Sequence, residues 1–264
     1  MDQASPISSI STPVWRAIES ASRRTGVDFE YLLDQARIES GFRPDARAAT
    51  SSASGLFQFT TQTWLTTLKR HGAEHGFGWA TEAIAPVGKG SYRIADPSLR
   101  NAILDLRNDP EAAAVMAGEL ASDNRAHLAD ALGRAPEPVD LYLAHFLGSA
   151  GASDFLKAWA ANPDQPAATL FAKAAAANRP VFFDASGSPR SLDAIRRSFA
   201  AKLSADVGLN PRPEMATHRS AIASTMPNWT SLEMGAIEPM PKRLSLDFAR
   251  DAYRKLSGAR GAAA

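Results

Sequence analysis

Residues typical of helix starts and helix ends occur at regular intervals along most of the sequence. No other structural signal is as frequent. A capping residue followed by proline, a pair that suits the first turn of a helix, stands at three of these helix starts. The three pairs are Thr12-Pro13, Asp96-Pro97 and Asp109-Pro110. Strand patterns are almost absent, and only residues 180–189 have the turn residues and apolar content of a short extended segment. The sequence therefore predicts an all-α fold.

Apolar residues between these boundaries recur with helical spacing, and glycines stand where the apolar stripes end. In the second expected helix, Asp28 is a candidate N-cap, Leu32 and Ala36 belong to the apolar stripe, and Gly41 is the stop. The expected helices run from Thr12 to Gly26, Asp28 to Gly41, Thr60 or Thr61 to Gly72, Asp109 to Gly133 and Pro138 to Gly148, and over residues 153–161, 165–177 and 191–204. Residues 1–205 are therefore expected to form one domain.

From about residue 206 the helical pattern gives way to a stretch punctuated by prolines, which indicates a linker. An apolar residue then recurs at every fourth position, at Leu244, Phe248, Ala252 and Leu256. This spacing predicts an amphipathic helix over residues 244–256, at the end of a separate region 206–264. The helix is expected either to pack on its own domain or to dock to a partner protein.

The charge balance and the absence of cysteine exclude several classes of function. Lys and Arg together number 29 against 28 Asp and Glu, and no run of five like charges occurs, so a nucleic-acid partner is not expected. Without cysteine the chain has no disulfides and no thiolate metal sites. Its apolar runs fall short of the roughly 18 to 20 residues that span a bilayer, so no transmembrane segment is expected.

The amino terminus, MDQASPISSISTP, does not have the pattern of a secretory signal. It carries an acidic residue where such signals have basic ones, and it lacks an apolar stretch of about seven residues. A signal peptide is therefore not expected here, and the chain is either a processed form or is exported by another route.

Two short motifs suggest ligands at first sight but lack the features of a ligand site. In HGAEH, His71 and His75 are each followed by glycine, which predicts a helix end and a turn rather than a metal pair. VGKGS lacks the spacing of a phosphate-binding loop. No metal and no cofactor are expected.

Glu39 is the first candidate for chemistry, because it lies on the last turn of the second expected helix, in QARIESGF. At about 100° per residue, its positions relative to Leu32 and Ala36 place it at the edge of the apolar stripe. A carboxyl group there is partly removed from water, which favours the neutral form that a general acid requires. The alternative is a glutamate that simply reaches solvent at a helix end.

The stretch ESGFRPDARAATSSASGLFQFTTQTW combines a helix-terminal Glu-Ser, an aromatic residue, a proline-containing turn, a Ser/Gly loop and Gly-Leu-x-Gln. In this order the features resemble the signature of the soluble lytic transglycosylase family. DLYLAHFLGSAGA is similar to the family's later Ala-Tyr-Asn-Ala-Gly segment, and the resemblance covers about residues 14–160.

The chain departs from the family in two places. Its loop between Glu39 and Gly55 is one residue longer than the commonest form, and His145-Phe146 replaces Tyr-Asn, whose tyrosine hydrogen-bonds the catalytic acid in relatives.

The resemblance implies a lysozyme-like domain that cleaves the MurNAc-GlcNAc β-1,4 bond of peptidoglycan without water and leaves a 1,6-anhydro-MurNAc end. Glu39 is implied to be the sole acid and base. Gln58 is expected to bond sugar groups, and aromatic rings are expected to form walls unless they pack in the core. The residues implied to bind the glycan are Ser40, Gly55, Phe57, Gln58, Phe59, Tyr142 and His145. The partner is then a peptidoglycan glycan strand, and the location is periplasmic or otherwise cell-wall-facing.

Two alternatives stay open at this point. A hydrolytic muramidase of goose-lysozyme type would need a second carboxylate to position water. Asp34 is about 140° round the helix from Glu39, whereas Asp45 in the following loop is a candidate, although its place after a proline favours turn capping. A non-catalytic wall-binding or assembly module would need no catalytic carboxylate.

Overall fold

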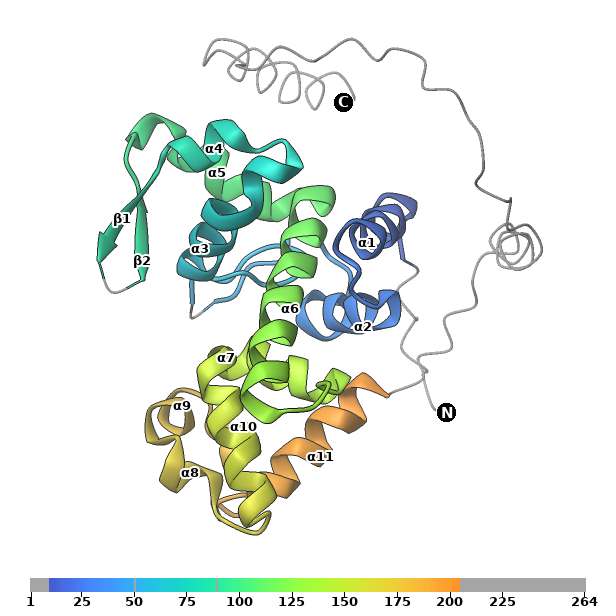
Figure 1. Ribbon diagram of the computed structural model, residues 1–264, viewed down its shortest axis with the longest axis vertical. Coiled ribbons are helices and arrows are strands. Elements are labelled where there is room, and N and C mark those ends of the chain that lie inside the picture. Colours follow the sequence, from blue (N-terminus) through green and yellow to red (C-terminus); the bar gives the residue numbers. More distant parts are fainter. Residues whose placement is uncertain (1–9, 50, 89, 205–264) are drawn as a thin grey trace, which may run out of the picture. The chain divides into compact units, whose positions relative to one another are not determined.

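The computed structural model describes residues 10–49, 51–88 and 90–204 (Figure 1). The chain divides after Ala205 into two units, and the described residues all belong to the first of them. The predicted helix over 244–256 and the proline-rich linker before it lie outside the described residues. The described part is mostly helical, as the sequence predicts. None of its helices is both long enough and apolar enough to cross a membrane.

The order of elements along the chain is simple, with one short hairpin among the helices. The elements are α1 (Thr12–Thr25), α2 (Phe29–Ser40), α3 (Thr61–His71), η1 (Gly72–His75), α4 (Gly78–Glu82), β1 (Ile84–Gly88), β2 (Ser91–Ile94), η2 (Pro97–Leu99), α5 (Arg100–Asp105), η3 (Leu106–Asn108), α6 (Pro110–Leu132), α7 (Pro138–Ala161), α8 (Ala167–Leu170), α9 (Ala172–Ala177), α10 (Arg179–Phe182) and α11 (Leu192–Leu203). The η elements are short 3-10 helices.

Side-chain caps begin several helices where the sequence predicts them. The Asp28 carboxylate accepts a hydrogen bond from the Tyr31 amide at 2.9 Å, and Asp109 caps α6 in the same way. Each such bond satisfies an amide group that a helix leaves unpaired at its start. The first helix differs by one residue from the prediction, because Ser11 is the N-cap and Thr12 is already helical.

The hairpin of β1 and β2 shows that the expectation of extended structure only within residues 180–189 is wrong. The two strands pair antiparallel, with Ile84 opposite Ile94, and both of these side chains are buried. The strands have five and four residues, too few for an alternating pattern to stand out in the sequence. Residues 180–189 contain part of α10, followed by a single bridge between Phe183 and Pro189.

Three expected helices are joined or divided differently. α7 covers the two helices expected over residues 138–148 and 153–161, and Gly148, the predicted end of the first, forms a kink whose φ of 76° and ψ of 160° are not helical. The helix expected over 165–177 is broken at Phe171 into α8 and α9. The ring of Phe171 packs against Phe155 with centroids 5.8 Å apart. This tertiary contact is found at the break between α8 and α9. No proline or glycine at this point of the sequence indicates the break.

The alanine-rich helix α6 packs against α1, α3 and α7, and it runs through the middle of the described unit (Figure 1). The side chains from Ala112 to Ala117 are all buried. A methyl group on Gly118 would lie 2.5 Å from the hydroxyl oxygen of Thr25. The close approach of α1 to α6 therefore depends on the absence of a side chain at this position.

The last described helix, α11, packs against both α7 and α2 and so brings these two helices together. Phe199 of α11 lies edge-on to Tyr142 of α7, with ring centroids 5.1 Å apart. Arg37 of α2 donates a hydrogen bond to the Lys202 carbonyl of α11 at 2.6 Å. The end of α2, where Glu39 lies, is thereby held beside the first half of α7.

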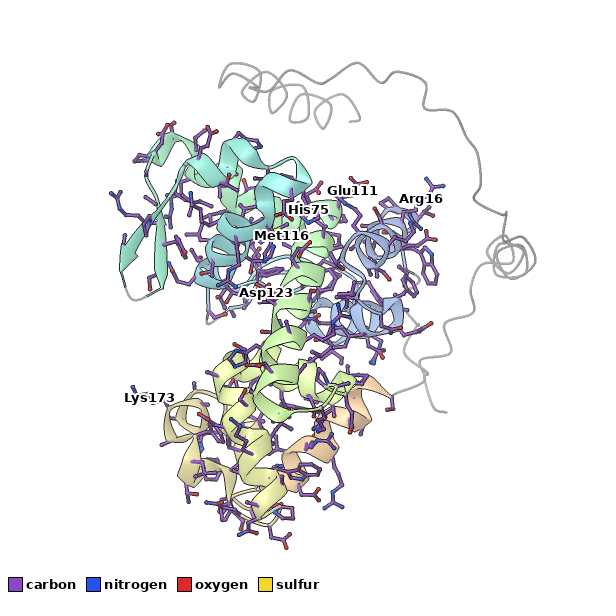
Figure 2. The ribbon with its side chains drawn as sticks, viewed as in Figure 1. Arg16, His75, Glu111, Met116, Asp123 and Lys173 are labelled. Carbon is purple, nitrogen blue, oxygen red and sulfur yellow. The ribbon has the colours of Figure 1, made fainter. Side chains whose placement is uncertain are left out.

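A cluster of histidines and carboxylates joins α3 and η1 to α6; two of its members, His75 and Asp123, are labelled in Figure 2. His71 Nε2 lies 3.0 Å from Asp123 Oδ2, and His75 Nε2 lies 2.6 Å from Glu119 Oε1. Arg70 also donates to Asp123 at 2.7 Å. As predicted, His71 ends a helix and His75 lies in the turn after it.

Asp123 should make the stability of this cluster depend on acidity. Burial raises the pKa of Asp123, but hydrogen bonds from His71 and Arg70 more than offset this, and its net pKa lies below the ordinary value. Its stabilising contribution is therefore present above the unfolded-state pKa of about 3.9 and is lost as pH falls through the folded-state value. We expect Asp123→Asn to lower Tm by about 2 to 4 °C near neutral pH.

Thermal unfolding of this variant followed by circular dichroism at neutral pH and at about pH 3 tests the prediction. The difference from wild type should fade at the lower pH. Asp130→Asn, an exposed position on the same helix, is the control for a lost surface charge. An equal difference at both pH values would contradict the prediction.

Candidate active site

Glu39 lies on the last turn of α2, at the boundary between core and solvent, as its place on the apolar stripe predicts. Its side chain is 18% exposed. The helix ends one residue later because Gly41 adopts a left-handed conformation with φ of 60° and donates to the Arg37 carbonyl at 2.9 Å. The carboxyl group is therefore partly sheltered but still open to a ligand.

Two side chains of α7 reach the same oxygen of Glu39. The Tyr142 hydroxyl donates to Oε1 at 3.2 Å, and His145 Nε2 lies 3.3 Å from that atom. Because Tyr142 and His145 are three residues apart on a helix, they share one face. Within the described part of the chain, Oε2 of Glu39 has no hydrogen-bond partner. One carboxyl oxygen is thus anchored, and the other is left for a substrate.

A tyrosine hydroxyl does reach the carboxyl group of Glu39, but it comes from Tyr142 rather than from position 145. Tyr142 was expected as a wall for the glycan, whereas its ring is 7% exposed and packs on Phe199. Burial raises the pKa of Tyr142, and the neighbouring charge of Glu39 and the hydrogen bond to it raise it further. The hydroxyl group therefore stays protonated, and remains a donor, throughout the neutral pH range.

Ser40, expected among the glycan-binding residues, is buried and joins α2 to the loop that follows. Its hydroxyl group lies 2.8 Å from the Leu56 carbonyl oxygen and 3.1 Å from that of Ala36. It also accepts a hydrogen bond from the Arg43 amide at 3.2 Å. The residue after Glu39 therefore fixes the loop against the helix end, which indicates a structural task rather than contact with a ligand.

Gln58, expected to bond sugar groups, directs its amide nitrogen back into the same loop. This nitrogen donates to the carbonyl oxygens of Ala46 at 3.1 Å and Gly55 at 2.9 Å. Because an amide nitrogen has two protons, both are used within the protein. Only the amide oxygen of Gln58 is left to accept a hydrogen bond from a ligand.

Phe42 and Gln58 are the non-glycine residues of the described chain that have a positive φ, 63° and 48° respectively. Such backbone conformations cost an L-residue about 1 kcal/mol or more. They persist where the surrounding contacts enforce them, and they gather at functional sites. Here they stand at the beginning and near the end of the loop that follows Glu39, which supports this region as the functional one.

Arg107, which the sequence did not single out, holds this loop from the opposite side. Its guanidinium group is buried and donates to the Ser52 carbonyl at 2.8 Å and the Phe59 carbonyl at 3.1 Å. Burial lowers the pKa of Arg107, although a guanidinium group stays charged. The Arg107 carbonyl lies so close to Gly55 that a methyl group there would be 1.8 Å from it. Gly55, expected to bind glycan, is thus required for this close backbone approach.

The rings of Phe57 and Phe59, expected as walls for the glycan, are 1% and 3% exposed. Phe59 packs edge-on against Trp64, with centroids 5.2 Å apart. The two rings fill the core beneath the loop. Their position therefore agrees with core packing rather than with a surface that stacks on a sugar.

In the described residues, no second carboxylate is hydrogen-bonded to Glu39 or to its two α7 partners. Asp34 pairs with Arg37 at 2.8 Å instead. Burial raises the pKa of Asp34 despite this pair. Asp45 is exposed in the loop.

Across residues 10–49, 51–88 and 90–204, no group of three or more His, Asp or Glu side chains is arranged to hold a metal ion.

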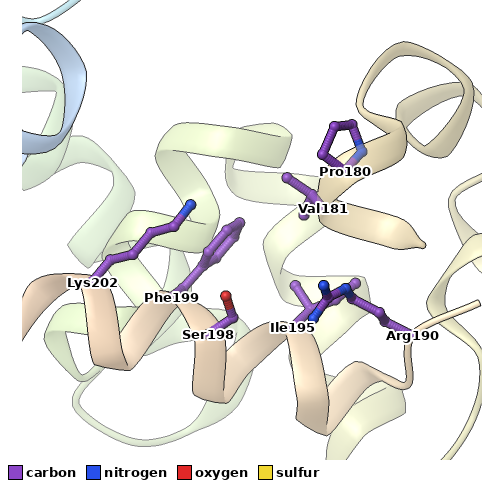
Figure 3. A pocket seen from close by; sticks show the side chains of 7 residues that line it. All are labelled: Pro180, Val181, Arg190, Ile195, Ser198, Phe199 and Lys202. Atoms are coloured by element: carbon purple, nitrogen blue, oxygen red, sulfur yellow. The ribbon is translucent and has the colours of Figure 1, made fainter. Parts of the chain in front are cut away.

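A separate hollow of about 180 Å³ lies between α10 and α11 (Figure 3). Its lining combines apolar side chains with two cations, and it consists of Pro180, Val181, Arg190, Ile195, Ser198, Phe199 and Lys202. It contains no carboxyl group that could serve as an acid. Its Phe199 ring also packs against Tyr142, which donates to Glu39.

No family model matches the chain. Support for a function therefore comes from the residues around Glu39 and from the contacts that hold them.

Proposed function

We propose that this protein is a peptidoglycan lytic transglycosylase whose first unit is a lysozyme-like domain, and that Glu39 is its only acid and base. The observation that carries the proposal is the setting of the Glu39 carboxyl group. It is mostly sheltered at a helix end, Tyr142 donates to one of its oxygens with His145 3.3 Å from that atom, and the second oxygen has no partner among the described residues. The strained loop beside it supports the same location.

The proposed reaction needs one carboxyl group in two successive states. Protonated Glu39 gives its proton to the glycosidic oxygen as the bond from that oxygen to C1 of MurNAc breaks. The resulting carboxylate then removes the proton of the same sugar's C6 hydroxyl group, whose oxygen bonds to C1. The 1,6-anhydro ring closes, no water is consumed, and Glu39 regains its proton.

The direct contacts of Glu39 in the described residues suit this reaction, because none of them is a second carboxyl group. Hydrolytic glycosidases commonly use two carboxyl groups about 5 to 9.5 Å apart, one of which activates water or attacks the sugar. Here the groups at hydrogen-bond distance from Glu39 are a phenol and an imidazole. Both can donate to the carboxyl group, and a phenol that stays protonated does not activate water.

The proposed substrate sets the location and the partner. A peptidoglycan glycan strand is reached only in the periplasm or at another face of the cell wall. A polar, mostly uncharged polymer also agrees with the even charge balance of the chain. The proposal does not depend on the region 206–264, which lies outside the described residues.

Digestion of purified cell-wall sacculi in water enriched in oxygen-18, followed by mass spectrometry of the released fragments, tests the proposed function. We expect 1,6-anhydro ends without incorporated label. Labelled reducing ends would instead identify a hydrolase and would direct attention to Asp45. The absence of any released fragment would favour a non-catalytic wall-binding module.

A further inference from the structure

Gln35 lies one helical turn before Glu39 on the same side of α2, and its side chain is almost completely buried, with 3% of the residue exposed. Its amide nitrogen, Nε2, lies 2.9 Å from Nδ1 of His145. His145 in turn approaches Glu39 with its other ring nitrogen, Nε2, at 3.3 Å. The imidazole ring is therefore held between an amide and a carboxyl group.

The chemistry of the amide determines where the imidazole proton lies. An amide nitrogen can only donate, so Nδ1 of His145 must offer a lone pair to Gln35. In a neutral ring the single proton is then on Nε2, which lies 3.3 Å from Oε1 of Glu39. Tyr142 donates a hydrogen bond to the same oxygen. Both groups that approach this oxygen are therefore neutral.

The oxygen of the same amide shows what the opposite orientation would require. The Gln35 oxygen is buried and has no hydrogen-bond partner among the described residues. Turning the amide would bring this oxygen to Nδ1 and would require a proton there. Nε2 of a neutral ring would then carry a lone pair directed at Oε1 of Glu39, which also carries lone pairs. This contact would be unfavourable unless the carboxyl group or the ring took up another proton. The orientation of Gln35 and the protonation of the Glu39–His145 pair are thus linked.

We propose that Gln35 is a positioning residue that holds His145 as the neutral tautomer with its proton on Nε2. The inference rests on the proposed function, because that reaction needs Glu39 as an acid and then as a base. A neutral donor to Oε1 is compatible with both states. An imidazolium would instead hold Glu39 as the carboxylate and would remove the general acid.

The other ionisable groups of this region come from three helices. On α2 they are Tyr31 and the Asp34–Arg37 pair, and on α7 the nearest is Tyr142. On α11, the Lys202 ammonium lies over the Phe199 ring, 5.4 Å from its centroid. Burial raises the pKa of Tyr31, followed by the effects of Tyr142 and Glu39, so this phenol also stays neutral. Apart from Glu39 itself, the groups in direct contact with His145 are therefore uncharged.

Nitrogen-15 NMR of histidine-labelled protein reads the tautomer without any measurement of activity. The full chain has five histidines, and the spectrum of His145→Tyr identifies the signals of His145. In wild type near neutral pH we expect Nδ1 to show the shift of an unprotonated nitrogen and Nε2 that of a protonated one. A proton found on Nδ1 would overturn the proposal.

Substitution of Gln35 makes the test specific. In Gln35→Glu the new carboxylate should draw a proton to Nδ1 and raise the titration midpoint of His145 by about one to three pH units. In Gln35→Met, which has no strong donor, the two neutral tautomers should mix. Gln165→Glu makes the same change outside the site and should leave the His145 signals as in wild type. If Gln35→Glu does not fold, Gln35→Met decides the question.

The pH–rate profile then connects the tautomer to catalysis. In Gln35→Glu the acid limb should move to higher pH with the histidine, whereas a merely structural effect would lower the rate equally at all pH values. His145 signals that are identical in wild type and both Gln35 variants would overturn the proposal. Correct signals in a wild-type protein that cleaves no glycan would instead reject the proposed function and leave the tautomer assignment intact.

Discussion

Glu39→Gln is expected to reduce the turnover of peptidoglycan by at least about a hundredfold, the low end of the contribution of a general acid and base. The amide has nearly the same shape as the carboxyl group, but it can neither give a proton to the glycosidic oxygen nor take one from the C6 hydroxyl group. Release of anhydro-muropeptides from sacculi, quantified by liquid chromatography and mass spectrometry, measures the loss.

The local structure should survive this change. The oxygen of the new amide can still accept the hydrogen bond that Tyr142 donates to Oε1 of Glu39, and it can still lie beside His145. Circular dichroism and thermal unfolding should therefore match those of wild type closely. Asp45→Asn, a loss of one exposed carboxyl group in the following loop, is the matched control and should keep its activity.

The two variants together separate the alternatives. Loss of activity in both would indicate two cooperating carboxyl groups and a hydrolytic mechanism. More than about a hundredth of the wild-type rate in Glu39→Gln would reject Glu39 as the sole acid and base. A wild-type protein without turnover, which still binds sacculi, would agree with a wall-binding module.

Sequence reasoning located the helices and Glu39 because both depend on interactions within a few residues. The Asp28 cap and the Gly41 stop are local features, and they define α2 without any knowledge of the rest of the chain. The place of Glu39 at the edge of an apolar stripe then follows from helix geometry. For the same reason the class of the fold could be predicted.

The surroundings of Glu39 could not be predicted, because they come from distant parts of the chain. Tyr142 reaches the carboxyl group across 103 residues, and Gln35 meets His145 across 110. Nothing in the sequence singles out Gln35, which is one of several polar residues in its helix. Only the packing of α2 against α11 and the side-chain contacts between α2 and α7 show what it contacts.

The hairpin and the loop support were missed for related reasons. The strands of the hairpin are too short for a periodic signal. Arg107 carries no local sign that its guanidinium group, besides its bond to the nearby Leu104 carbonyl, donates to two carbonyl groups 48 and 55 residues away along the chain. The sequence singled out Gly55, but through the resemblance of Gly55-Leu56-Phe57-Gln58 to a family signature rather than through its contact with the backbone of Arg107.

Gly55→Ala is expected to cause the largest loss of stability among single substitutions near the site. The new methyl group would lie 1.8 Å from the carbonyl oxygen of Arg107, which belongs to the backbone and cannot turn away as a side chain would. Gly55 also has a φ of 85°, where alanine is strained. A cost of about 4 kcal/mol or more is expected, which places the change among the exceptional ones.

Gly133→Ala provides the control that separates backbone strain from steric conflict. Gly133 ends α6 with a φ of 65°, and a methyl group there would meet no atom within 4 Å. Its substitution should cost only the strain of a left-handed alanine, about 1 to 2 kcal/mol. Urea unfolding of both variants, with wild type alongside, gives the two free energies of unfolding. If Gly55→Ala costs no more than Gly133→Ala, Arg107 does not hold the loop as tightly as inferred.

Gly55→Ala should also disturb the site, because the segment around Gly55 is hydrogen-bonded to the end of α2. Displacing Gly55 moves Leu56, whose carbonyl oxygen is bonded to the Ser40 hydroxyl group at 2.8 Å. Ser40 directly follows Glu39, so the carboxyl group would lose part of its alignment with Tyr142. In any fraction of Gly55→Ala that folds, kcat should therefore fall, whereas folded Gly133→Ala should cleave glycan at the wild-type rate. Equal kcat values in the two folded variants would show that the loop stabilises the domain without positioning Glu39.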